Sequence, residues 1–387
     1  MNPRIRRILA LVIVLSSAAL VAVAALRLIA PDVLVDLDML GPGLAERVFP
    51  PPVCAALGLA TGLAGVMLGL LGRALPPTVL RCAAIIVAAS AMLLTPGGMI
   101  PVAGYTFAMV VIVGLVVLTA LLVRRHPWWG LALIIVLAGI MTWAIARLHG
   151  AELARAFIAS FGGVFPGALL AAAHLLLAVA LVVHASAGRR DAFGWWVLRH
   201  RIAITIIAAA CALPYTIARV SWLTPWPLLA PDAVDLADMP MVLLTGLSLG
   251  AAMLAGGVLT LGLILPWGRR FPRWMAGVGG RPVPVALAVV PASMVAALFT
   301  AGGVDLILSV ADGGLGDGSL VQVIEFVLVF PFWLWGPLLA LATWGYAMAR
   351  RSDAATIAGA ERVTHADARS HPPVFTRQPR VAKRASM

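Results

Sequence analysis

The feature that most constrains this chain is a series of uncharged apolar stretches, several of which reach the roughly 18–20 residues that a helix needs to cross a bilayer. Backbone groups in lipid must be hydrogen-bonded within a helix or a closed barrel. The stretches are continuous rather than alternating, which excludes a transmembrane barrel. Only 11% of the residues are charged and 62% are hydrophobic, so a water-soluble surface is not available. The sequence therefore predicts an all-α, polytopic helical membrane bundle.

Hydrophobic runs between clusters of charged residues predict about ten transmembrane helices. Three arginines precede the first run, and residues 22–24 resemble a signal-peptidase site, so cleavage of the first helix is the alternative to its retention. This run is longer than a usual signal segment, which favours retention. The predicted spans cover residues 8–30, 53–72, 82–101, 105–123, 127–146, 165–187, 202–222, 241–266, 283–304 and 321–348.

Arginines mark one side of the predicted bundle. With the N-terminus in the cytoplasm, 23 of the 28 basic residues fall on the inner side and 12 of the 16 acids on the outer side. Basic inner loops determine the orientation of helical membrane proteins. The sequence therefore predicts a multi-pass plasma-membrane protein with both termini cytoplasmic. Because the positive charge lies at helix ends and in the tail, nucleic acid is not a predicted partner.

The lipid bilayer is the predicted partner of the helices. Residues 349–387 are basic and lack an apolar period, so we expect a disordered cytoplasmic tail. Each Arg or Lys close to anionic lipids gains on the order of 1 kcal/mol. We therefore expect the tail to bind anionic lipids of the inner leaflet. Association with other membrane subunits is left open.

Two segments of the chain resemble each other. Six of twelve positions are identical between residues 28–39 and 228–239, and residues 94–98 resemble residues 299–303. Order and spacing agree, which predicts a parallel repeat of two four-helix units. The alternative is chance similarity between helices rich in Ala, Leu and Gly. The predicted units are residues 1–126 and 189–348, joined by a helical hairpin at 127–188 and followed by the tail at 349–387.

Glycines gather on one face of two predicted helices. In the second predicted span they are spaced by four, three, four and three residues, which places them on one helix face. Such a face lets a neighbouring backbone approach closely. We expect helix packing rather than ligand binding at Gly58, Gly62, Gly65, Gly69 and Gly72, and at Gly246 and Gly250 in the eighth span.

Motifs for cofactor or metal chemistry are absent from the sequence. There is no H-E-x-x-H, C-x-x-C or Walker loop, so we expect no cofactor and no metal. Residues 246–250 spell G-x-S-x-G, but a nucleophile elbow needs a strand, turn and helix, whereas these residues lie in the middle of a predicted helix. No catalytic residue is predicted.

Four ionisable residues near the predicted outer ends of helices form a candidate buried polar cluster: Arg27, Arg219, Asp305 and Glu325. Ionisable groups at membrane depth usually face the protein interior and pair. We therefore expect Arg27 or Arg219 to contact Asp305 or Glu325. The alternative is that the arginines extend to the lipid headgroups.

Two predicted external loops are acidic. Carboxylate oxygens at this spacing suit a hard cation, but solvated acids that support the topology are the favoured interpretation. The candidate residues are Asp32, Asp36 and Asp38 in the first loop, and Asp232, Asp235 and Asp238 in the second.

Residues 265–274, 279–284 and 213–215 carry a resemblance to known sequences. The phrases Leu-Pro-Trp-Gly-Arg-Arg-Phe-Pro-Arg-Trp, Gly-Gly-Arg-Pro-Val-Pro and Leu-Pro-Tyr resemble parts of uncharacterised multi-pass membrane proteins of high-GC Gram-positive bacteria. The resemblance covers about a quarter of the chain. It implies a plasma-membrane location and no known activity.

Three classes of function fit the sequence. Permease-like transport of a small solute is favoured by the repeat and by prolines that interrupt predicted helices, since transporters build sites at discontinuous helices. An accessory or assembly subunit of a membrane complex is the alternative, because few polar residues suit a solute site. An enzyme acting at the outer leaflet is the third class. The interrupting prolines are Pro214, Pro291, Pro331 and Pro337.

Overall fold

A computed structural model gives the structure of the protein. The residues that it describes form helices and turns, with one isolated bridge between Arg270 and Pro282. The described residues are 3–30, 40–72, 74–100, 115–116, 119–120, 122–124, 127–148, 150–186, 192–230, 239–273, 279–314 and 317–370. The prediction of an all-α protein is confirmed for this part of the chain.

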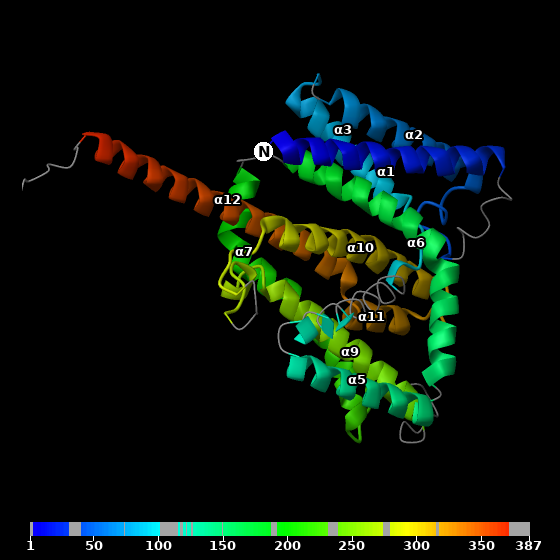
Figure 1. The fold of residues 1–387 in the computed structure, drawn as a ribbon. Helices are drawn as coiled ribbons and strands as arrows, with labels where there is room; N and C mark the ends of the chain where they lie inside the picture. Colours follow the sequence, from blue (N-terminus) through cyan, green and yellow to red (C-terminus); the bar gives the residue numbers. More distant parts are fainter. Residues whose placement is uncertain are drawn as a thin grey trace, which may run out of the picture.

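Figure 1 shows the helices as two groups that lie side by side. Proline is the first residue of five of the helices, where its missing N–H would be unbonded in any case and its fixed φ suits the helix. The helices are α1 (Pro3–Ile29), α2 (Pro51–Leu71), α3 (Pro77–Leu93), α5 (Pro127–Leu148), α6 (Gly150–Ser186), α7 (Ala192–Ala210), α8 (Leu213–Val220), α9 (Pro240–Leu261), α10 (Val285–Ala311), α11 (Leu320–Val329) and α12 (Phe332–Ser370).

Seven segments of the described chain are long and apolar enough to cross a membrane. The helices Pro77–Leu93 and Pro127–Gly139 are also apolar but shorter, and the predicted span 105–123 lies largely outside the described residues. The chain is therefore an integral, multi-pass helical membrane protein. The seven segments are Pro3–Ile29, Pro51–Leu71, Gly162–Ser186, Ala192–Leu223, Val242–Leu261, Val285–Ala311 and Leu320–Asp353.

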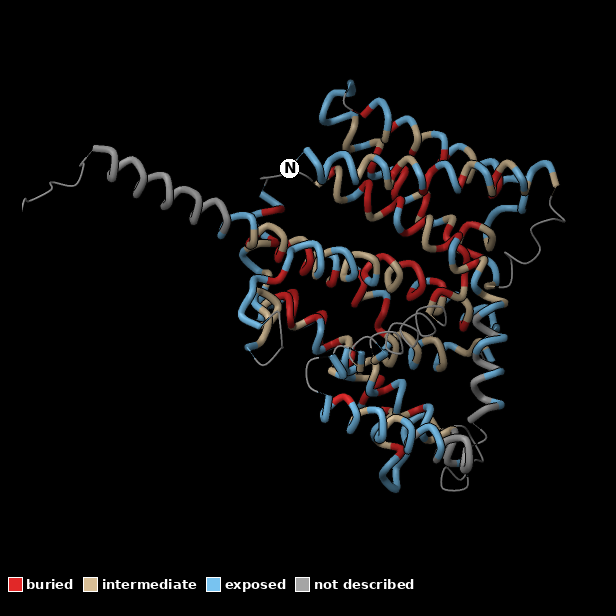
Figure 2. The backbone as a smooth tube through the Cα atoms, viewed as in Figure 1, coloured by how far each residue is buried: buried red, intermediate tan, exposed pale blue. Residues whose placement is uncertain are grey.

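The burial pattern fits lipid as the surrounding solvent. Buried positions face neighbouring helices, whereas the outward faces are exposed (Figure 2). These outward faces carry large apolar side chains such as Leu11, Leu70 and Ile86. An apolar surface of this extent would be unfavourable in water and is favourable against hydrocarbon.

The first bundle consists of α1, α2, α3 and the second half of α6. Its core contains Ile13 and Leu20 of α1, Leu68 of α2, and Leu177 and Leu181 of α6. The α6 helix packs on both α1 and α3. The segment 162–186, which the sequence assigned to a linking hairpin, thus contributes side chains to this core.

Close packing of α1 on α2 depends on glycine. A Cβ atom on Gly62 would lie 2.7 Å from Val21 Cγ2, and one on Gly69 would lie 2.6 Å from Val14 Cγ2. Gly58 and Gly65 also face α1. Gly72 ends α2 and faces Leu80 of α3 instead, since a Cβ there would lie 3.1 Å from Leu80 Cδ1.

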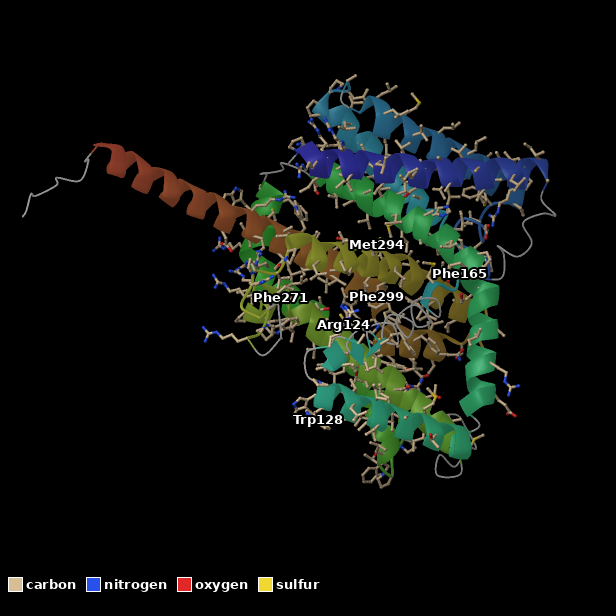
Figure 3. All side chains as sticks on the ribbon, in the orientation of Figure 1. Arg124, Trp128, Phe165, Phe271, Met294 and Phe299 are labelled. Carbon is tan, nitrogen blue, oxygen red and sulfur yellow. The ribbon has the colours of Figure 1, made fainter. Side chains whose placement is uncertain are left out.

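The second bundle consists of α7 to α12. Buried Val197, Leu339 and Tyr346 join α7 to α12, and α10 packs along α12. Phe299 of α10 (Figure 3) has its ring centroid 4.7 Å from that of Phe332 and 5.0 Å from that of Trp335. Aromatic side chains in tilted contact therefore fill the space between α10 and α12.

On α9, both candidate packing glycines face the segment that follows α7. Gly246 lies against the ring of Trp222, and a Cβ on Gly250 would lie 2.8 Å from Arg219 Cβ. The Thr216 hydroxyl donates a hydrogen bond to the Gly250 carbonyl oxygen at 3.2 Å. The α8 and α9 backbones approach each other closely at this point.

The two bundles meet along α6 and α10. A small core of Met99, Ala171, Leu175 and Ala297 joins them, with Met294 of α10 packed against it. The small side chains of Ala171 and Ala297 in this core allow α6 and α10 to lie beside each other, as Figure 1 shows.

Proline accounts for two breaks in the second bundle. The chain leaves the helix at residues 211–212 before Pro214, and at Phe330 before Pro331. Pro291 and Pro337 lie within continuous helices, so no break occurs at these two prolines. In α6 the chain bends near Phe165 (Figure 3), beside Pro166.

The beginning of the tail differs from the sequence prediction. Residues 349–387 were expected to be disordered, but α12 continues to Ser370. The segment after residue 352 is rich in alanine, a strong helix former, and contains no proline before Pro372. Residues 371–387 lie outside the described part of the chain.

Candidate functional site

The segment of residues 40–50, between α1 and α2, is hydrogen-bonded to the end of α3. Gly97 donates its backbone N–H to the Gly41 carbonyl oxygen at 3.2 Å, and Ala45 donates to the Leu93 carbonyl oxygen at 3.0 Å. Gly41 and Gly98 have positive φ values of 85° and 65°, a conformation that favours glycine. These turns place Arg47 against α10 of the second bundle.

Arg47 forms the centre of an ionic cluster at this point. Its Nη2 atom donates to Asp305 Oδ1 at 2.9 Å and to Ser309 Oγ at 2.7 Å, and its Nη1 atom contacts the Asp312 carboxylate. Asp305 and Ser309 lie on α10 and Asp312 caps its end; the spacing of four and three positions places them on one side of the helix. We call Arg47, Asp305, Ser309 and Asp312 the Arg47 cluster.

Burial distinguishes the two carboxylates of the Arg47 cluster. The side chain of Asp305 is 10% exposed and that of Arg47 is 17% exposed, whereas that of Asp312 is 62% exposed. Asp305 also accepts a hydrogen bond from the Gly98 backbone N–H at 3.0 Å. Both partners of Asp305 therefore come from the first bundle, and its charge depends on Arg47 for compensation.

A cavity of about 360 Å³ adjoins the Arg47 cluster. One wall comes from the first bundle and its loops, and the other wall comes from α10 of the second bundle. With one arginine and two aspartates, the cluster gives the cavity one excess negative charge. Residues that line it include Pro42, Arg47, Met99 and Ile100 on one side, and Gly302, Asp305, Ser309 and Asp312 on the other.

A second ionic pair lies near the end of α1. Arg27 Nη1 donates to Glu46 Oε1 at 3.2 Å, and Glu46 Oε2 accepts the backbone N–H of Gly43 at 2.9 Å. The adjoining cavity has a volume of about 30 Å³, which is close to the volume that one water molecule occupies in the liquid. Buried His174 of α6 lines it, with Nδ1 at 2.9 Å from the Leu170 carbonyl oxygen.

The four residues of the predicted polar cluster lie in different surroundings. Arg27 pairs with Glu46, and Asp305 pairs with Arg47. Arg219 lies over the rings of Tyr215 and Trp222, at 4.7 Å and 4.2 Å from the ring centroids. Glu325 is exposed on α11. Among the described residues, Arg27, Arg219 and Asp305 therefore contact other groups than those expected from the sequence.

Glu46 and Arg47 are the site residues that the sequence interpretation missed. Arg47 is one of only five arginines on the predicted acidic side, and it follows a Gly-Pro-Gly turn directly beside a carboxylate. An arginine on the predicted acidic side was therefore the sequence signal that could have pointed to this site. The acidic-loop residues Asp32, Asp36, Asp38, Asp232, Asp235 and Asp238 lie outside the described residues.

The loop before α11 is ordered by its own polar groups. The Asp317 carboxylate accepts a hydrogen bond from the Ser319 backbone N–H at 2.9 Å, and this bond lowers the pKa of Asp317. Ser319 in turn caps α11 by accepting the N–H of Gln322 at 3.3 Å. Within the described residues, no group of His, Cys, Asp and Glu side chains is arranged to hold a metal ion.

Comparisons of the chain with protein-family models, with curated proteins and with solved structures found no match.

Proposed function

We propose that this protein is a permease that moves a small polar solute along the contact between its two helical bundles. The observation that carries the proposal is the 360 Å³ cavity beside the Arg47 cluster, which is lined from both bundles. Solute sites of transporters lie between structural repeats, and charged groups there pair with one another. A cavity of this size admits solutes that range from a few heavy atoms to a drug-sized fragment.

An internal repeat with a revised correspondence supports the proposal. In the first bundle α1 packs on α2 and α6, and α3 packs on α6. In the second bundle α7 packs on α9 and α12, and α10 packs on α12. A Val-Phe-Pro sequence stands at 164–166, where α6 bends, and again at 329–331, before α12. We propose that α6, rather than span 105–123, corresponds to α12 in a parallel repeat.

We also propose that about ten helices cross the plasma membrane with both termini in the cytoplasm, as the arginine distribution favours. Cysteines introduced as Asp36→Cys and Asp235→Cys should then react with a membrane-impermeant maleimide added to intact cells. The natural cysteines are first replaced by serine or alanine. Labelling of these positions only after the cytoplasmic side is opened would contradict the orientation.

Transport can be measured without knowing the solute. Proteoliposomes are exposed to isosmotic urea, glycerol, glycine or glycine betaine, and vesicle swelling is followed by stopped-flow light scattering. We expect at least one solute to enter faster than into protein-free vesicles. Gly302→Leu should return this rate to the protein-free value, because a side chain at Gly302 projects beside the cavity wall, with Cβ 3.1 Å from Ile100 Cδ1.

Glu152→Gln is the matched control, since Glu152 is exposed on α6 and does not line this cavity. It should swell at the wild-type rate. If vesicles that contain the wild-type protein swell no faster than protein-free vesicles in any of these solutes, the permease proposal is contradicted. Equal rates in wild-type and Gly302→Leu vesicles would contradict the assignment of this cavity.

An accessory-subunit function is the alternative, and one observation favours it. The α5 helix packs on few other described elements and carries exposed Trp128, Trp129, Ile135 and Met141. These side chains give α5 an exposed apolar surface that a partner helix could cover. Recovery of one stoichiometric membrane partner in mild detergent, abolished by Ile135→Lys, would favour this alternative.

A further inference from the structure

Arg219 lies in surroundings that differ from those of the paired arginines. Its guanidinium group lies 4.7 Å from the ring centroid of Tyr215 and 4.2 Å from that of Trp222. No ion pair of Arg219 occurs among the described residues, and its buried Nε atom has no hydrogen-bond partner. Within the described part of the chain, the positive charge is thus held by two aromatic faces, which supply only part of the compensation that a carboxylate gives.

The two aromatic rings are fixed in position. Tyr215 and Trp222 are both buried, and the Tyr215 ring centroid is 4.8 Å from that of Phe330. The Trp222 indole N–H donates to the Leu228 carbonyl oxygen at 2.9 Å, and Gly246 of α9 leaves room for the ring. The Arg219 stem is held in the same way, because its Cβ packs against Gly250. The guanidinium group is therefore held on a rigid support.

The position of Arg219 along the chain places it at the depth of lipid headgroups. It lies four residues before the end of the candidate span Ala192–Leu223. Exposed Ile217, Val220, Leu223 and Trp226 surround it along the sequence and present apolar side chains to the outside. An exposed tryptophan at the end of a span is typical of the membrane interface.

We propose that Arg219, Tyr215 and Trp222 form a binding site for the phosphate group of an anionic lipid. Stacking on a ring uses the face of the guanidinium plane, which leaves the N–H groups along its edge available as donors. Two parallel N–H donors match two oxygens of a phosphate diester, a geometry that lysine cannot reproduce. The apolar surface around the site accommodates the acyl chains of the same lipid. This site is separate from the cavity beside the Arg47 cluster and does not rest on the transport proposal.

The test uses the full chain, purified in a neutral detergent. Phosphatidylglycerol, phosphatidylcholine or inorganic phosphate is titrated, and the shift of the thermal unfolding midpoint and the retained lipid in native mass spectrometry are measured. We expect phosphatidylglycerol to stabilise the wild type more than phosphatidylcholine does. Arg219→Gln should bind phosphatidylglycerol about tenfold more weakly, as expected for loss of charged hydrogen bonds.

Arg155→Gln is the matched control, because Arg155 is exposed on α6. It removes the same charge and should bind phosphatidylglycerol as the wild type does. Arg219→Lys keeps the charge without the planar edge and should bind with intermediate strength. It also preserves the test if Arg219→Gln does not fold.

Each remaining outcome contradicts the proposal. Equal phosphatidylglycerol binding by wild type, Arg219→Gln and Arg219→Lys would exclude Arg219 from the site. Equal losses in Arg219→Gln and Arg155→Gln would show a general effect of net charge. Stabilisation by inorganic phosphate that equals that by phosphatidylglycerol, and is lost in Arg219→Gln, would assign the site to free phosphate rather than to a lipid.

Discussion

Replacing Arg47 by glutamine is expected to destabilise the protein by about 3–5 kcal/mol, because it leaves the buried Asp305 carboxylate without a positive partner. The loss comes from an uncompensated charge at the contact between the bundles, where, among the described residues, Asp305 accepts hydrogen bonds from Arg47 and from the Gly98 N–H and is 10% exposed. Chemical or thermal unfolding of the purified protein in detergent measures the change.

The Arg47 cluster provides its own controls. Asp312→Asn should cost less than about 1 kcal/mol, since the Asp312 side chain is 62% exposed and water compensates its charge. The double variant Arg47→Gln/Asp305→Asn should recover most of the lost stability, because the unpaired charge is gone. A double variant as unstable as Arg47→Gln alone would contradict this account.

Replacing Gly65 by leucine is expected to prevent α1 from packing on α2. A Cβ at this position would overlap the Ser17 hydroxyl and would lie 3.1 Å from Ser17 Cβ. Ser17 is fully buried and cannot move aside into solvent. Excess volume in a packed core costs about 1–3 kcal/mol, and more where backbones must separate. Size-exclusion chromatography in detergent should show little monodisperse protein.

Gly139→Leu is the matched control for Gly65→Leu, since no atom lies within 4 Å of a Cβ built on Gly139. This variant should remain monodisperse. For the smaller substitution Gly65→Ala, a second substitution Ser17→Ala should restore monodisperse protein, because it removes the hydroxyl oxygen nearest to the new methyl group. Normal yield of Gly65→Leu would mean that the α1–α2 contact does not depend on glycine at this site.

Much of the fold could be predicted because lipid imposes local rules. Each helix must satisfy its own backbone, so uncharged length alone reveals a span. Helical spacing also places glycines on one face of α2 before any partner is known. The extension of α12 to Ser370 was missed because charged residues were taken to mean disorder, although alanine keeps the helix propensity of that segment high.

The Arg47 cluster could not be predicted in the same way. Arg47 and Asp305 are 258 positions apart, and no periodicity relates a loop residue to a distant helix. The sequence did identify Asp305 as a candidate for pairing, on the general rule that ionisable groups at membrane depth pair. Which arginine pairs with it depends on the path of residues 40–50, and turns at glycines determine that path.

The path of residues 40–50 links the two bundles. This short stretch belongs to one bundle by its hydrogen bonds to the end of α3, yet its arginine ends on a helix of the other bundle. Any change in how the two bundles contact each other at this point would have to separate the Arg47 guanidinium group from the carboxylates of Asp305 and Asp312, which stand beside the cavity. The contact between the bundles and the wall of the cavity therefore share the same ion pairs.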